Sequence, residues 1–99
     1  MPNYPDSAEL KRIQEWDAIN DALGLLEFIK PLFEEYGRIE ITGKMVKRVK
    51  MATGGWSGNE EIIGALRRNL MFWPLYWEKS QRGGAYWFRI DTRINKRKQ

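Results

Sequence analysis

The sequence predicts an α+β fold in which helices cover one face of a four-stranded, mainly antiparallel sheet. Three observations support this prediction. Apolar residues recur every three or four positions in the first third of the chain, two later stretches alternate as β-hairpins do, and a second helical repeat separates them. The resulting order, α-β-β-α-β-β, is economical when the helices pack on one face of the sheet. The other face of such a sheet is left to solvent.

The composition fits a single globular domain. The 99 residues are 42% hydrophobic and 30% charged, which is an ordinary balance for such a protein. We divide the chain into an N-terminal segment (residues 1–6), one α+β domain (7–91) and a basic C-terminal tail (92–99). The first residues lack the features of a signal peptide, and no apolar run reaches the length of a membrane span. We therefore expect a cytoplasmic protein without membrane contact.

The chain contains neither histidine nor cysteine. The usual zinc, copper and iron ligand sets are therefore missing, and so is the commonest general base. Because no motif brings two acidic side chains together, we expect no catalytic residue, no metal site and no cofactor. The sequence thus predicts a protein that is not an enzyme. Its net charge of +4 favours an anionic partner.

The first helical stretch begins after Asp6 or Ser7, and Glu9 is placed to complete a capping box with Asp6. Pro31 disfavours helical geometry at the preceding residue, so we expect a kink or a break near residues 27–31. One long kinked helix and two consecutive short helices both fit the pattern. The apolar stripe consists of Ile13, Trp16, Ile19, Leu23, Leu26, Ile29, Phe33 and Tyr36.

Residues 38–51 predict a β-hairpin with its turn at Gly43 and Lys44. Arg48 and Lys50 share one face of the second strand. Lys47 lies on the other, more apolar face, which indicates an edge strand or a bulge.

The next stretch, TGGWSGNEE, is rich in glycine but lacks the Gly-Lys-Ser/Thr ending that supplies a cation to bound phosphates. We interpret Ser57 and Glu60 as a capping box that starts the second helix, and we expect Trp56 to hold this loop against the domain. The helix should end near Asn69 or Leu70, with Arg67 and Arg68 pointing outward. Its apolar stripe consists of Ile62, Ile63, Leu66 and Leu70.

The closing hairpin, MFWPLYWEKSQRGGAYWFRI, holds seven of the thirteen aromatic residues. A turn of two or four residues within 81–84 divides its side chains between the same two faces, whereas a turn of three residues would not. The face that we expect to pack on the helices holds Trp73, Leu75, Trp77, Tyr86, Phe88 and Ile90. The opposite face holds Pro74, Tyr76, Glu78, Trp87, Arg89 and Asp91.

Tyr76 and Trp87 are the two rings that this division leaves on the open face. Exposed Trp and Tyr side chains are enriched in binding hot spots, and they also stack on nucleic-acid bases. Alternatively they pack under the N-terminal segment, under the tail or across a dimer interface. Neighbouring candidates for binding are Arg89 and, if the two hairpins adjoin, Arg48 and Lys50. Candidates for phosphate contacts in the tail are Arg93, Lys96, Arg97 and Lys98.

The stretch TGGWSGNEEIIGALRRNLMFW and the pattern W-x-x-S-x-R-G-G-x-Y-x-F at residues 77–88 resemble short uncharacterised proteins encoded by bacteriophages and prophages. The resemblance covers residues 53–90 and implies no activity and no binding residues. It implies that the chain is encoded by a phage or mobile element, and small phage proteins without catalytic groups often bind a host protein or nucleic acid. We therefore expect a binding protein that acts on a host protein through the aromatic and basic sheet face. The alternatives are a module for single-stranded nucleic acid or RNA and a homodimer or larger homo-oligomer.

Overall fold

The computed structural model describes residues 4–93, which form an α+β domain of four helices and a four-stranded antiparallel sheet. The predicted fold class is therefore confirmed, although the element order is α-α-β-β-α-α-β-β. No helix in this part of the chain is both long and apolar enough to cross a membrane. The elements are α1 (Ser7–Glu15), α2 (Ala22–Phe33), β1 (Arg38–Thr42), β2 (Val46–Ala52), α3 (Ser57–Arg68), α4 (Phe72–Tyr76), β3 (Trp77–Gln81) and β4 (Ala85–Asp91).

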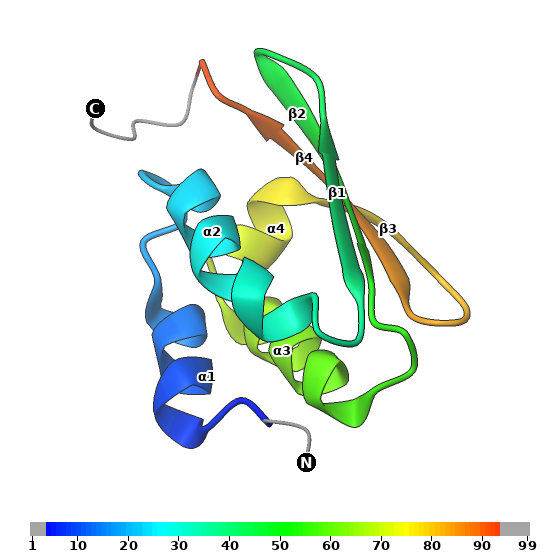
Figure 1. Ribbon diagram of the computed structural model, residues 1–99. Helices are drawn as coiled ribbons and strands as arrows, with labels where there is room; N and C mark the ends of the chain where they lie inside the picture. Colours follow the sequence, from blue (N-terminus) through cyan, green and yellow to red (C-terminus); the bar gives the residue numbers. More distant parts are fainter. Residues whose placement is uncertain (1–3, 94–99) are drawn as a thin grey trace.

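The strands lie in the order β1-β2-β4-β3, so the two hairpins adjoin through β2 and β4. The helices lie on one side of the sheet, and no described element covers its other side (Figure 1). The expectation that Lys47 marks an edge strand or a bulge is wrong, because β2 is a central strand that pairs in regular register with β1 and with β4. Lys47 instead donates a hydrogen bond of 3.0 Å from Nζ to the carbonyl of Gly43, so its long side chain reaches the polar turn.

The core lies between the helices and the sheet. Its largest fully buried side chains are Phe33 of α2, Phe72 of α4 and Phe88 of β4. The rings of Phe72 and Phe88 lie 5.1 Å apart between centroids, so α4 packs directly on the central part of the sheet. Helix α1 packs on α3.

The first helical stretch is divided at residues 16–21, and not near Pro31 as expected. Helix α1 ends where the side chain of Asn69 donates hydrogen bonds to the carbonyls of Ile13 (2.8 Å) and Trp16 (3.1 Å). Helix α2 then starts at its own N-cap, Asp21, which accepts the Gly24 amide hydrogen. Pro31 lies in the last turn of α2 without ending the helix there.

Two capping predictions have opposite outcomes. The capping box of α1 is confirmed, since Asp6 and Glu9 each accept the other's backbone N–H. The capping box of α3 is wrong: its N-cap is Trp56, no side chain caps the helix, and the Ser57 hydroxyl instead pairs with the Tyr4 hydroxyl at 2.9 Å. The Ser57 hydroxyl therefore holds Tyr4 against the start of α3 and does not cap the helix.

Trp56 holds its loop against the domain, as expected. Its ring contacts Tyr4 at 5.0 Å and Tyr36 at 4.7 Å between centroids. At the other end, α3 stops at Arg68 with Asn69 as its C-cap, also as expected. Since the chain leaves helical geometry there, Leu70 is 85% exposed and does not extend the apolar stripe.

The closing hairpin differs most from its prediction. Residues 72–76 form α4, so β3 begins only at Trp77. The turn has three residues, 82–84, because Gln81 pairs with Ala85, and both glycines in it have positive φ. A bulge then shifts the register between Trp77 and Lys79. The helix, the turn and the bulge together overturn the predicted division of faces before β4.

The outcome can be stated for five predicted positions. Leu75 is 56% exposed and Trp77 42% exposed, although both were expected in the core. Tyr76 is buried, although it was expected on the open face. Along β4 the prediction is confirmed for Phe88 and Ile90, which are fully buried.

Candidate functional site

The sheet face that points away from the helices carries alternate residues of all four strands. The register sets Lys50 of β2 and Lys79 of β3 opposite Trp87 of β4, one on each side, and it sets Arg48 opposite Arg89 in the next row. We call this surface the open face. It consists of Arg38, Glu40, Thr42, Val46, Arg48, Lys50, Ala52, Lys79, Gln81, Ala85, Trp87, Arg89 and Asp91.

Trp87 stands at the centre of the open face and is partly buried there. The ammonium group of Lys50 lies 5.4 Å from the centre of its ring, and that of Lys79 lies 4.4 Å from it. Cation–π contacts of this kind contribute about 0.5–1 kcal/mol at exposed sites. The indole of Trp87 is therefore flanked by two positive charges and is not an isolated apolar side chain.

The open face has more cations than its acids neutralise. Arg38 pairs with Glu40, and Arg48 pairs with Glu78 from the bulge of β3, each at 3.7 Å and in contact with solvent. Exposed pairs like these contribute about 0–1 kcal/mol, so another anion can replace the carboxylate at little cost. Three further cations of this face have no ion pair within residues 4–93: Lys50, Lys79 and Arg89.

Arg93 lies two residues beyond the end of β4 and is already paired with Asp91. Its Nε and Nη2 donate to the two carboxylate oxygens at 2.9 and 2.8 Å, and its backbone N–H donates at 3.0 Å. These hydrogen bonds lower the pKa of Asp91 from 3.8 to about 2, and the carboxylate in turn raises the pKa of Arg93. Of the tail residues predicted to contact phosphate, three lie outside the described part of the chain: Lys96, Arg97 and Lys98.

The Asp91–Arg93 contact predicts a pH effect on stability. Because the pKa of Asp91 is lower in the folded protein, the contact stabilises the fold above about pH 4 and is lost as the pH falls towards about 2. We expect the Tm of the wild type to fall more across this range than that of Asp91→Asn, by a small margin because solvent screens the contact. Thermal melts followed by circular dichroism between about pH 5 and about pH 2 test this. Parallel Tm curves for the two proteins would contradict it.

Three shallow hollows follow β1 and β2 along the open face. The first, of about 280 Å³, is bounded by Glu40, Thr42, Arg48, Val49, Lys50 and Trp87. The second, of about 200 Å³, is bounded by Arg38, Glu40, Lys50 and Ala52. The third, of about 230 Å³, is bounded by Tyr36, Gly37, Arg38, Ala52 and Gly54.

Each hollow shares two bounding residues with the next: Glu40 and Lys50 join the first to the second, and Arg38 and Ala52 join the second to the third. We call this series the sheet groove. Each hollow is smaller than the roughly 300–1,000 Å³ of a pocket for a drug-sized molecule. The series therefore suits an extended ligand better than a compact one.

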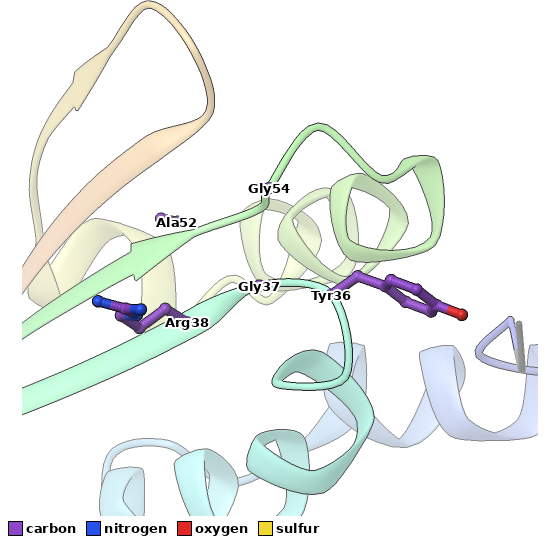
Figure 2. A pocket seen from close by; sticks show the side chains of 5 residues that line it. All are labelled: Tyr36, Gly37, Arg38, Ala52 and Gly54. Carbon is purple, nitrogen blue, oxygen red and sulfur yellow. The ribbon is translucent and has the colours of Figure 1, made fainter.

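The third hollow lies where the chain enters β1 and leaves β2. Figure 2 shows Gly37 and Gly54 at this crossing, with the side chains of Tyr36 and Arg38 leaving it in opposite directions. A Cβ on Gly54, whose φ is +69°, would meet the carbonyl oxygen of Tyr36, and a Cβ on Gly37 would meet that of Ala52. A Cβ on Gly37 would also meet the side chains of Asn59 and Phe33, so the two backbones require glycine here.

The structure brings together four of the five binding residues predicted within the domain: Arg48, Lys50, Trp87 and Arg89. The fifth prediction is wrong, because the helical geometry of α4 turns Tyr76 inward. Tyr76 is 7% exposed, and its hydroxyl donates a hydrogen bond of 2.7 Å to the carbonyl of Ala18.

Sequence reasoning missed two cations of the open face. Arg38 precedes the buried Ile39 in β1, so the alternation of the strand is the sequence signal that places Arg38 on the open face. The face on which Lys79 lies could not be predicted from the sequence, because it depends on the length of the turn and on the bulge.

The described residues offer no site for a metal ion, since no three His, Cys, Asp or Glu side chains among them are grouped to hold one. No family model matches the chain, and no curated protein or solved structure shows a significant similarity to it.

Proposed function

We propose that this protein binds single-stranded nucleic acid through its open face and catalyses no reaction. The observation that carries the proposal is the position of Trp87 between Lys50 and Lys79, at the centre of a face with an excess of cations. Base stacking on an aromatic side chain contributes about 1–3 kcal/mol per base. The ammonium groups of Lys50 and Lys79, which lie over the Trp87 ring, would move aside for a stacked base and neutralise the phosphates next to it. We place this activity in the cytoplasm.

A single strand fits this surface better than a duplex does. Within a duplex the base faces are stacked on one another, so Trp87 has nothing to stack on. An open four-stranded sheet with a ring among cations is also the arrangement with which several RNA-binding modules take up unpaired bases. That comparison is one of layout and supports the proposal only as an analogy.

Binding of a host protein, which the sequence favours, has less support in the geometry of the open face. It depended on two apolar anchors, and one of them, Tyr76, lies in the core. The other, Trp87, has an ammonium group beside it on each side, whereas the cores of protein interfaces are depleted of lysine. Self-association of two open faces is also disfavoured, because it would bring two cationic surfaces together.

Fluorescence anisotropy with labelled oligothymidylate and oligouridylate tests the proposal. The binding constant is expected to fall with salt, with a logarithmic slope of about −0.7 for each phosphate neutralised. Trp87→Ala should weaken binding by about 5- to 150-fold, which corresponds to the loss of about 1–3 kcal/mol of stacking. Trp77→Ala is the matched control, because it removes an equally large and more exposed ring that lies on the helix side of the sheet.

Two charge variants sharpen the test. Arg89→Ala should weaken binding and make the salt slope shallower by about one unit. Glu78→Gln should strengthen binding, because it frees Arg48 from its ion pair. Absence of binding at low salt, or equal affinities of the wild type and Trp87→Ala, would contradict the proposal. A host protein would then be the leading candidate, to be sought by pull-down from nuclease-treated lysate.

A further inference from the structure

We infer that the sheet groove is a track for one continuous strand, and that Tyr36 at its far end is a second stacking site. This inference rests on the proposed function, since it concerns how far a strand bound at Trp87 extends over the protein. Stacking of one base on Trp87 does not by itself require that the strand continue along the sheet groove. The order of the hollows and the aromatic cluster beyond the third one are independent observations.

The course of the track follows from the sheet register. Trp87 lies opposite Lys50, and Arg38 lies opposite Ala52, two residues further along β2. Two strand spacings and two residue rises put the Cα atoms of Trp87 and Arg38 about 12 Å apart. Lys50 and Arg38 border the middle hollow on this course together with Glu40, and a phosphate of the strand would replace Glu40 in its ion pair with Arg38.

Beyond Arg38 the groove reaches the glycine crossing, where Gly37 and Gly54 let the two backbones approach closely. Tyr36 leads away from the crossing on the far side (Figure 2). Its ring is 45% exposed although Trp56 packs on it at 4.7 Å. A ring that is supported on one side and open on another is suited to stacking on a base.

The far end differs from the centre in charge. Glu34 and Glu35 directly precede Tyr36, so this corner has no excess of cations in its sequence neighbourhood. Tyr36 can therefore contribute stacking but no phosphate neutralisation. This difference separates the two sites experimentally: a change at Tyr36 should alter affinity without altering the salt slope.

The test is a length series of oligothymidylates of about four, six, eight and twelve nucleotides, within the range of known single-strand site sizes. The variant is Tyr36→Leu, which keeps an apolar contact with Trp56 but removes the aromatic face, and Tyr36→Phe is the matched control that keeps the ring. We expect Tyr36→Leu to bind the longer strands at least 5-fold more weakly and the shortest strand as the wild type does. Trp87→Ala should weaken binding at every length, and Tyr36→Phe should behave as the wild type.

The outcomes distinguish the two proposals. If Trp87→Ala loses affinity while Tyr36→Leu matches the wild type at every length, the track is wrong and the proposed function stands. A salt slope that changes with Tyr36→Leu would also overturn the stacking role. If the wild type binds no oligonucleotide of any length, the proposed function itself fails, and the track fails with it. Circular dichroism of each variant confirms that it is folded before it is titrated.

Discussion

Replacing Asn69 with alanine is expected to lower the free energy of unfolding by about 3 kcal/mol or more, since each buried polar group left unpaired costs about 1–3 kcal/mol. The Asn69 side chain is fully buried and uses both of its polar atoms. Its Nδ2 donates to the carbonyls of Ile13 and Trp16, and its Oδ1 accepts the amide hydrogens of Met71 and Phe72, each at 2.9 Å. Alanine would leave the amide hydrogens of Met71 and Phe72 without these acceptors, and the carbonyls of Ile13 and Trp16 would keep only their backbone donors.

Urea denaturation followed by circular dichroism measures this effect, and two variants control it. Asn69→Asp has the same size and still accepts the two amide hydrogens, but it sets an oxygen against two carbonyls and should also destabilise the fold. Asn20→Ala removes an exposed asparagine that is hydrogen-bonded to Asp17, and its effect should stay within about 0.5 kcal/mol. A stability of Asn69→Ala close to that of the wild type would show that these hydrogen bonds do not hold the helices.

Asn69 matters because it joins the ends of three helices: the C-termini of α1 and α3 and the N-terminus of α4. In Asn69→Ala, α1 should become the least stable helix, since it packs mainly on α3 and loses two hydrogen bonds at its end. Hydrogen exchange of the α1 amides would therefore rise before that of the sheet. Uniform acceleration over the whole domain would indicate instead that the chain unfolds as one unit.

Phe88→Ala is expected to lower the free energy of unfolding by about 3–5 kcal/mol, the usual cost of truncating a buried large aromatic side chain. Phe88 is fully buried and packs against Phe72 at 5.1 Å and Trp73 at 5.5 Å between ring centroids. Trp77→Ala should cost clearly less, although Trp77 is the larger residue. Trp77 is half exposed, stacks on Trp73 at 5.9 Å, and donates from Nε1 to the hydroxyl of Ser80 at the sheet edge.

The comparison tests the geometry of the closing hairpin. A two-residue turn without a bulge puts both side chains in the core, and the two losses would then be similar. The three-residue turn and the bulge of the structure separate them. Urea denaturation of both variants decides the matter, and Phe88→Leu keeps the measurement possible if Phe88→Ala does not fold. Equal losses of stability would contradict the register described for β3.

Most of the open face could be predicted from the sequence because β4 carries its own signal. Phe88 and Ile90 are apolar and alternate with Trp87 and Arg89, so the faces of this strand follow from its periodicity whatever the turn. The stretch before the turn carries a weaker signal. FWPLY is short and apolar, and such a run fits a buried strand as well as a helical turn. Strand periodicity therefore predicts an exposed Tyr76, whereas the helical geometry of α4 buries it.

The sequence by itself determined the α+β class, the first hairpin, the capping box of α1 and the two faces of β4. Each of these depends on residues that are near one another in the chain, through periodicity, a turn or a local hydrogen bond. Only the tertiary structure decided where the first helix ends, which strand lies at the centre and which face Lys79 occupies. Asn69 ends α1 from more than fifty residues away, the pairing of β2 with β4 makes β2 central, and the bulge of β3 forms only against β4. Contacts of this kind depend on packing between distant segments, which local patterns do not encode.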